Sequence, residues 1–252
     1  DAQESRGLGD VYKRQKFDND IINSDNDLIA FKDTAIDEFY KTESGFILDS
    51  EQKDVLDTFE NADGKLFLSA PTSFGKTFLL KEIIYRHREN YSNIVIVLPT
   101  VALLIEVTEE IDDFNEKHSL DYTIYNSIYK DLELSERNIF ILTPERVLRL
   151  LAIVPDIELD FFFFDEIYKI DEDVALSSED DVNDKIELGN DNPQRDEQDH
   201  RAAAFRLALY FLLKKCNSCY LAGPFIELNN LKDGFNKMLE KHHICLLYTS
   251  PS

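Results

Sequence analysis

The stretch Ala70-Pro71-Thr72-Ser73-Phe74-Gly75-Lys76-Thr77 decides the fold that this sequence predicts. It follows a short apolar run at residues 65–69 and opens a helical pattern at residues 76–88. A strand that turns through such a loop into a helix is the setting of a phosphate-binding loop, where backbone amides and the positive end of the helix hold phosphates. The strict pattern begins with glycine and Ala70 stands in its place. A strand-turn-helix with a chance Gly-Lys-Thr is therefore the alternative.

The end of this stretch has the chemistry that a nucleotide site needs. Lys76 is placed to reach the β and γ phosphates, and the Thr77 hydroxyl beside it is placed to ligate Mg²⁺. The preceding residues would surround the same phosphates with their backbone amides. The predicted cofactor-binding loop consists of Pro71, Thr72, Ser73, Phe74, Gly75, Lys76 and Thr77.

A second candidate motif is an acid pair at the end of a wholly apolar run. Four phenylalanines at residues 161–164 are followed by Asp165 and Glu166. A buried strand with this ending points carboxylates at the carboxyl edge of a sheet, where ligands bind in open α/β folds. Asp165 there could hold Mg²⁺, and Glu166 could polarise an attacking water. Acid pairs are common in an acidic chain, but the position about ninety residues after a phosphate loop favours the functional reading.

From Phe46 onward, short apolar runs alternate with helical patterns. Continuous apolar strands predict a sheet buried on both faces, and the alternation predicts βαβ units. We therefore expect an α/β fold with a mainly parallel sheet and helices on both faces. The apolar runs lie at residues 66–68, 94–98, 139–142, 161–164 and 220–222. The helical patterns lie at residues 52–59, 76–88, 101–117, 144–151 and 201–215.

The formal net charge of −23 speaks against a nucleic-acid partner, because phosphate binding is mostly a basic-surface effect. The acidity is concentrated, however, in residues 171–199, which hold about a dozen acids and two bases and read as a solvated loop excursion.

A hydrophobic fraction of 43% fits a globular domain, and no apolar run approaches the length of a membrane span. Because the cysteines are too few for a disulfide framework, the expected compartment is a reducing cytoplasm without membrane partners.

Cys216 and Cys219 have the spacing of a zinc-ligand pair. A structural zinc site needs four ligands, and the nearby candidates, His242 and His243, are adjacent and badly placed to share one metal. The pattern therefore favours ordinary thiols near the sheet.

Taken in order, the motifs resemble those of superfamily 2 helicases of the DEAD/DEAH group. The four matching pieces, motifs I, Ia, Ib and II, are Ala70 to Thr77, Val97-Leu98-Pro99-Thr100-Val101-Ala102-Leu103, Leu142-Thr143-Pro144-Glu145-Arg146 and Asp165-Glu166-Ile167-Tyr168. The resemblance covers about residues 46–226. It implies the first RecA-like P-loop NTPase domain of a nucleic-acid-dependent ATPase or helicase of EC 3.6.4 type. The implied cofactors are ATP and Mg²⁺, and the implied partner is DNA or RNA.

Position by position, the resemblance assigns roles to the residues of motifs I and II. It also matches Gln52, in Leu48-Asp49-Ser50-Glu51-Gln52, to the family's upstream glutamine that reads adenine. The alternative for Gln52 is a surface position on a helix. The implied catalytic residues are Lys76, Asp165 and Glu166, and the implied Mg²⁺ ligands are Thr77 and Asp165.

Motifs Ia and Ib supply the implied nucleic-acid contacts, Thr100, Thr143 and Arg146. The helix that begins near Pro144 would offer free amides to a backbone phosphate. Such a contact needs little net positive charge, which softens the objection raised by the overall acidity.

Two departures from the family pattern concern coupling between ATP and nucleic acid. Tyr168 stands where the family usually has His or Asp at the end of motif II. Leu221-Ala222-Gly223-Pro224 lies where the family has its Ser-Ala-Thr motif III, so the usual hydroxyls are replaced.

The two ends of the chain point to a different origin from its middle. Residues 10–15 and 245–250 encode opposite strands of one oligonucleotide, which looks like the adapter of transposase-based sequencing libraries; coincidence is the alternative. We expect residues 1–15 and 245–252 to be adapter-derived tails that pack onto nothing in particular. Between them we expect a polar N-terminal segment at residues 16–45 and the RecA-like domain at residues 46–244. The chain would then be a metagenomic fragment of a parent whose second RecA-like domain is missing here.

Three functions stay open at this point. The first is the ATP-binding motor domain of a helicase or translocase, inactive in hydrolysis without its second domain. The second is a P-loop ATPase motor that remodels protein or serves a restriction or defence complex. The third is a non-catalytic scaffold of the same fold, against which the intact lysine, threonine and acid pair argue.

Overall fold

The computed structural model describes residues 40–167, 193–224 and 233–249, leaving aside the side chains of residues 193–200. Backbone contacts divide the chain into two compact units, Asp1–Asp54 and Val55–Ser252. In the first unit, Lys41 and Ile47 form an isolated antiparallel bridge. Helix α3 (Ser50–Asn61) begins in this unit and continues into the second.

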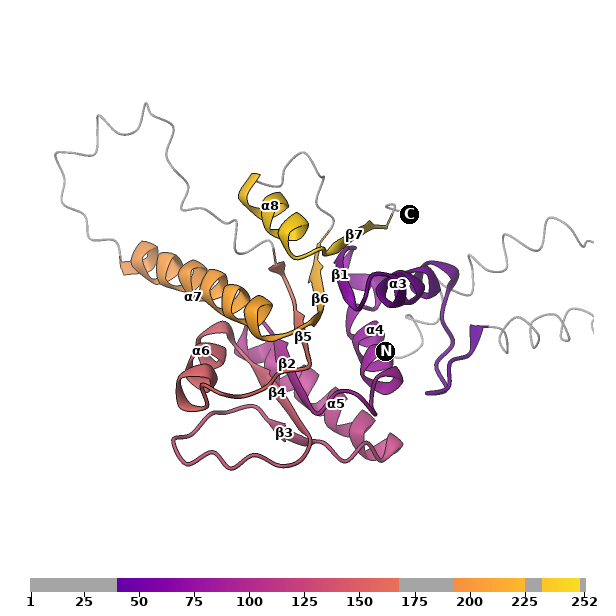
Figure 1. Ribbon diagram of the computed structural model, residues 1–252, viewed down its shortest axis with the longest axis horizontal. Coiled ribbons are helices and arrows are strands. Elements are labelled where there is room, and N and C mark those ends of the chain that lie inside the picture. The colour runs from indigo at the N-terminus through magenta and orange to yellow at the C-terminus, as the bar shows by residue number, and fades with distance from the viewer. Residues whose placement is uncertain (1–39, 168–192, 225–232, 250–252) are drawn as a thin grey trace, which may run out of the picture. The chain divides into compact units, whose positions relative to one another are not determined.

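The second unit is built on a seven-stranded parallel sheet in the order β3-β4-β2-β5-β6-β1-β7 (Figure 1). The register places Val95 of the third strand in this order opposite both Phe140 and Phe162. The strands are β1 (Lys65–Ser69), β2 (Asn93–Val97), β3 (Thr123–Tyr125), β4 (Asn138–Leu142), β5 (Phe161–Phe164), β6 (Ser218–Gly223) and β7 (Cys245–Tyr248).

Helices cover both faces of the sheet. Successive side chains of a strand point to opposite faces, so a wholly apolar strand has apolar side chains to bury on each face. On one face, Phe161 of β5 meets Phe59 of α3 edge to face, with ring centroids 6.1 Å apart. On the other, Phe164 of the same strand meets Phe205 of α7 at 5.7 Å. The remaining helices are η1 (Thr72–Phe74), α4 (Lys76–Arg86), α5 (Val101–His118), α6 (Pro144–Ile153), α7 (Pro193–Lys215) and α8 (Asp233–Lys241).

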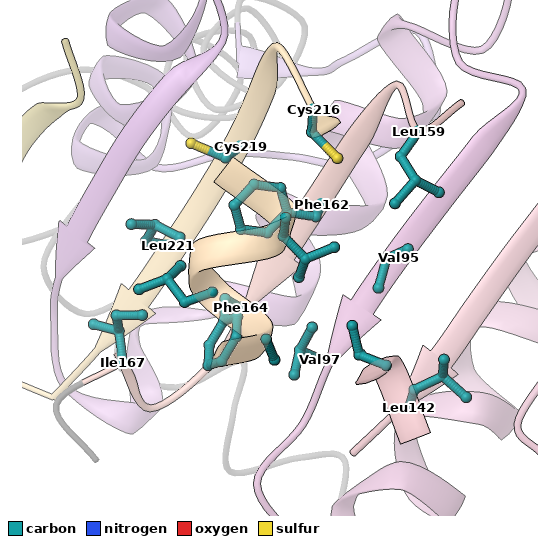
Figure 2. Close-up of a cluster of buried hydrophobic side chains, with 14 of the residues drawn as sticks. Val95, Val97, Leu142, Leu159, Phe162, Phe164, Ile167, Cys216, Cys219 and Leu221 are labelled. Carbon is teal, nitrogen blue, oxygen red and sulfur yellow. The ribbon is translucent and has the colours of Figure 1, made fainter. Parts of the chain in front are cut away.

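A core cluster of buried apolar side chains lies between the sheet and helices α6, α7 and α8. Figure 2 shows side chains of this cluster from several strands, among them Val95 of β2, Phe162 of β5 and Leu221 of β6. Cys216 and Cys219 belong to the same cluster as free, buried thiols. Burial raises the pKa of Cys219 to about 12, which favours the neutral thiol near neutral pH.

The predicted fold class is confirmed, and each of the five predicted strands and five predicted helices has a counterpart. Strand β3 and helix α8 were not predicted. The predicted acidic loop at residues 171–199 is wrong at its end, because α7 begins at Pro193 rather than near residue 201. Proline is favoured at the first helical position.

The expectation that residues 245–252 pack onto nothing is wrong for β7. This strand pairs in parallel with β1, from Leu66 with Cys245 to Ser69 with Tyr248. Without it, β1 would present an open row of backbone donors and acceptors, and Leu246 and Leu247 give the added strand apolar side chains. An apolar segment can fill such an edge whatever its origin, so the adapter hypothesis for both tails stays a hypothesis. Residues 1–15 lie outside the described residues.

Gly64 links α3 to β1 with a φ of +70°, and a Cβ there would lie 2.5 Å from Ser218 Oγ. We expect Gly64→Ala to lower the free energy of unfolding by about 2–4 kcal/mol, because left-handed strain and overpacking add. Gly234→Ala is the matched control, since its Cβ would meet nothing within 4 Å and alanine favours the helix by up to about 1 kcal/mol. Urea denaturation compares the two variants, and an equal response of both would contradict the expectation.

Candidate functional site

The loop between β1 and α4 has the geometry of a phosphate cradle. After Ser69, the chain extends through Pro71, makes the single turn of η1 and passes through Gly75 at φ +86° and ψ +38° into α4. A left-handed backbone of this kind is open to glycine at little cost. Because Gly75 is also the N-cap of α4, no side chain caps the first amides of the helix. The loop thus presents backbone donors and the positive end of a helix together.

The predicted loop residues differ in exposure. Pro71, Thr72 and Ser73 are exposed at the tip, and Phe74, Gly75 and Thr77 are half-buried. Thr77 follows Lys76 in the first turn of α4, so its hydroxyl lies beside the lysine at the start of the helix.

Lys76 is buried, with an exposed fraction of 8%. Its Nζ donates to the backbone oxygens of Ala70 at 3.1 Å and Gly223 at 3.4 Å. Burial lowers the pKa of Lys76, while the negative charges of Asp165 and Glu166 act to raise it. The site therefore holds a desolvated ammonium group in the electrostatic field of the acid pair.

The acid pair lies at the carboxyl end of β5, as predicted. The amide of Asp165 donates to Val97 O at 3.0 Å and so continues the pairing of β5 with β2 by one residue. Both acids are half-buried, and Ile167 directly after them is fully buried in the core. Since both acids act on the pKa of Lys76, the structure brings the predicted catalytic residues together at one edge of the sheet.

Glu166 has a φ of +50°, which is uncommon for a residue with a side chain. Strained backbone of this kind costs about 1–3 kcal/mol and clusters at functional sites. The buried Ile167 on one side and the strand ladder at Asp165 on the other hold this conformation in place. No sequence signal marks a left-handed glutamate, so the structure alone shows it.

Gly223, at the place of motif III, contacts the phosphate loop through its backbone. Its carbonyl oxygen accepts from the amide of Ala70 at 3.1 Å as well as from Lys76 Nζ. In addition, Ser69 Oγ donates to Pro224 O at 3.1 Å. The segment at the place of motif III thus still contacts motif I, although it lacks the family's hydroxyls. Tyr168, the other departure from the family pattern, lies outside the described residues.

Gln52 has a local role that the sequence analysis did not anticipate. Its Oε1 accepts from the amide of Asp49 at 3.1 Å, and Asp49 Oδ1 accepts from the amide of Gln52 at 2.7 Å. This reciprocal pair is a capping box at the start of α3. Gln52 belongs to the first unit and the phosphate loop to the second, so the adenine contact stays a prediction.

The three predicted nucleic-acid residues lie at the starts of α5 and α6. Thr100 caps α5, with its Oγ1 accepting from the amide of Leu103 at 3.3 Å. Thr143 precedes α6 with no side-chain cap on that helix, and its exposed fraction is 9%. Arg146 Nη1 donates to Asn126 O at 2.7 Å. Because β2 and β4 are neighbours, both helices begin at the same carboxyl edge as the acid pair.

Arg201 is a residue of this edge that sequence reasoning missed. From α7 its Nη2 donates to Pro99 O at 2.7 Å, one residue before Thr100. It lies next to the acidic stretch and belongs to no recognised motif, so only the fold reveals the contact. Arg201 thereby connects the helix that follows motif II in the chain to the backbone of motif Ia.

Two general searches of the described residues gave negative findings. No helix in residues 40–167, 193–224 and 233–249 is both long and apolar enough to cross a membrane. Within the same ranges, no group of three or more His, Cys, Asp or Glu side chains is placed to hold a metal ion.

Comparisons with known proteins identify relatives in sequence and in fold. The Anti-bacteriophage protein B of Escherichia coli (strain K12) is 29% identical over 198 residues, which are 77% of this chain and 24% of that protein. The chain therefore spans about a quarter of the length of this relative. Among solved structures, a DEAD box protein from the hyperthermophile Methanococcus jannaschii superposes with a TM-score of 0.50 at 18% identity. That match covers 91% of this chain and 54% of the other.

The family model of the DEAD/DEAH box helicases matches residues 49–200, which include the phosphate loop, the acid pair and the starts of α5 and α6. The fold, the order of the motifs and this match agree, and the chain belongs to the DEAD/DEAH box helicase family.

Proposed function

We propose that this chain is the Mg²⁺-ATP-binding motor domain of a nucleic-acid-dependent ATPase. The observation that supports it best is the field of Asp165 and Glu166 on the buried ammonium group of Lys76. Helicases of this family use ATP, generally with Mg²⁺. A scaffold that had lost activity would have no need to keep a desolvated lysine beside two carboxylates.

The residues of the site fit Mg²⁺-ATP by their chemistry. The uncapped first turn of α4 suits an anion, and so does the Lys76 charge. A hydroxyl at Thr77 and a carboxylate at Asp165 are the hard oxygen ligands that Mg²⁺ prefers. Gly75, with its positive φ, leaves the loop backbone without a side chain where phosphate would approach.

Each residue then has a distinct task. Bound Mg²⁺-ATP supplies the γ-phosphoryl group that is transferred. Lys76 would neutralise charge on the β and γ phosphates, and Thr77 and Asp165 would hold the metal. Glu166 would orient a water molecule and accept its proton at a carboxylate oxygen. The resemblance to the family assigns the reading of adenine to Gln52.

The nucleic-acid strand would run along the starts of α5 and α6. Thr143 leaves the first amides of α6 uncapped, and phosphate oxygens accept readily from such amides. Thr100 would position the strand at the start of α5, and Arg146 would contribute its guanidinium beside Asn126. This route relies on amides rather than on lysine-rich surface, which reconciles a nucleic-acid partner with a net charge of −23.

A second RecA-like domain would complete the site. The chain spans 24% of the E. coli relative and 54% of the DEAD box protein of known structure, so both are much longer. In motors of this kind an arginine from outside the phosphate loop stabilises charge on the transferred phosphoryl group. We infer that hydrolysis of EC 3.6.4 type requires such an arginine in addition to the residues of this domain.

Buried free thiols also suit a reducing cytoplasm.

A role in defence against bacteriophage is the second candidate at the biological level. It is favoured by the likeness to a protein named Anti-bacteriophage protein B over 77% of this chain. The two readings are compatible, because a defence protein can contain a nucleic-acid motor.

Equilibrium binding tests the proposal directly. The 252-residue chain is titrated with a fluorescent ATP analogue, with Mg²⁺ or with EDTA, and with single-stranded DNA or RNA oligonucleotides. We expect saturable, Mg²⁺-dependent nucleotide binding, with a stabilisation against unfolding of about 2.7 kcal/mol at a hundredfold excess over Kd. Absence of saturable nucleotide binding at millimolar concentration would instead support the non-catalytic scaffold.

A further inference from the structure

The loop that follows β3, residues 126–137, forms a pocket of about 360 Å³ outside the nucleotide site. This volume lies at the lower end of the range of small-molecule sites. The residues that line it and matter here are Tyr125, Asn126, Ser127, Tyr129, Asp131 and Glu133.

The loop is fixed to the domain at several points. Ile128 is buried in the core at 4% exposure, and Leu132 packs against the same core. The hydroxyl of Tyr125 donates to Glu133 O at 2.9 Å, which joins the two ends of the pocket. A pocket held in this way exists before a ligand arrives, so little ordering cost is left for binding.

Tyr129 lies between these two anchors and turns outward, with 69% of its surface exposed. An exposed aromatic ring on a fixed loop leaves apolar surface in contact with water. A partner that covers the ring removes this unfavourable contact. Its flat face is a suitable stacking surface for another ring.

The charges of the pocket decide what kind of group it accepts. Asp131 and Glu133 are its ionisable acids, and no lysine or arginine lines it in the part of the chain that the structure describes. A lining with two carboxylates suits an uncharged group better than a phosphate. An aromatic ring with amino groups on its edge would instead stack on Tyr129 and donate hydrogen bonds to a carboxylate.

The position of the pocket favours a nucleic-acid base. Tyr125 at the end of β3 is paired with Phe140 of β4, and Thr143 follows that neighbouring strand. Arg146, in the first turn of α6, donates to Asn126 in the pocket wall. The pocket therefore adjoins the start of the helix that is proposed to hold a backbone phosphate.

We propose that this pocket takes an unpaired nucleobase of the bound strand, stacked on Tyr129 and hydrogen-bonded to Asp131 or Glu133. The inference rests on the proposed function, because it requires a single strand at α6. It adds a contact to the bases themselves, whereas Thr100 and Thr143 would contact only the backbone. Stacking tolerates every base, while the two carboxylates favour bases with amino groups, such as adenine and cytosine.

The test compares two probes on the same chain: a fluorescein-labelled ten-nucleotide oligodeoxyadenylate and its fully abasic counterpart. Tyr129→Ala is expected to weaken binding of oligodeoxyadenylate about tenfold, since a stacked base contributes about 1–3 kcal/mol. Its binding of the abasic strand should be unchanged. Tyr129→Phe keeps the ring and should bind like the unmodified chain, and Tyr210→Ala removes a half-exposed tyrosine of α7 as the matched control.

The outcomes separate the two proposals. One outcome is that Thr143→Val weakens binding of both oligonucleotides while Tyr129→Ala weakens binding of neither. In that case the strand binds as proposed, and the assignment of the pocket to a nucleobase is wrong. If the unmodified chain binds neither probe, both proposals fail together. An octa-arginine peptide is titrated in parallel with the two oligonucleotides. If Tyr129→Ala weakens binding of this peptide and of neither oligonucleotide, the pocket belongs to a basic protein partner and the nucleobase assignment is overturned.

Discussion

Replacing Lys76 with alanine is expected to lower the affinity of this chain for Mg²⁺-ATP by at least about 100-fold. The substitution removes the ammonium group that would bridge two phosphates, and hydrogen bonds between charged groups contribute about 1.5–3 kcal/mol each. The loss of affinity should be near complete because Lys76 is desolvated, and water there cannot replace its charge. Fluorescence titration with a labelled ATP analogue measures the effect.

Lys81→Ala is the matched control on the same helix. Lys81 Nζ lies 3.0 Å from Glu110 Oε2 on the surface of α4, with side-chain exposures of 17% and 42%. A partly exposed pair of this kind contributes about 0–1 kcal/mol to stability. Lys81 lies outside the phosphate loop, so its loss should leave nucleotide affinity unchanged. Similar nucleotide affinity in both variants would show that the Lys76 loop does not bind ATP.

The pH dependence of binding gives a second measurement of the same lysine. Only the protonated amine attracts phosphate, and burial lowers the pKa of Lys76 in the free chain. As pH rises through that lowered pKa, the free chain loses the proton and its affinity for nucleotide falls. The fall should begin at lower pH than for an ordinary lysine and should be absent in Lys76→Ala. Asp165 and Glu166, which face the amine, act in the opposite direction but less strongly than burial.

Much of this architecture could be predicted because the deciding residues are local in sequence. A buried parallel strand needs an uninterrupted apolar run, so residues 161–164 predicted β5 and with it the position of the acid pair. The phosphate loop could be predicted for the same reason, since strand, loop and helix follow one another directly. What the sequence could not show is pairing order, which placed β6 beside β1 and brought Gly223 to Lys76.

The strand and the contacts that the sequence analysis missed have weak local signals in the sequence. Strand β3 is three residues long, and only its pairing with β4 defines it. Arg201 contacts Pro99 across about a hundred residues of chain, a separation at which no sequence pattern operates. Gln52 illustrates a different limit, because its motif match was noticed while its capping box, formed with a residue three positions away, was not.

The second large effect concerns hydrolysis. The 252-residue chain is expected to turn over ATP more slowly than about 10⁻² per second, with or without DNA or RNA. An arginine that reaches the γ phosphate is worth about 10³–10⁵ in kcat in phosphoryl-transfer motors. At this edge of the sheet, Arg146 and Arg201 each donate to a backbone carbonyl, of Asn126 and Pro99 respectively.

Single-turnover assays with radiolabelled ATP and excess protein measure this rate. Glu166→Gln should lower the residual rate further while leaving nucleotide affinity intact, because the amide cannot accept a proton from water. A second RecA-like domain joined in cis should raise the rate by about 10³-fold or more, and only then should nucleic acid stimulate it. Robust nucleic-acid-stimulated turnover by the chain as it stands would mean that its own residues complete the catalytic site, and the requirement for an arginine from a second domain would have to be abandoned.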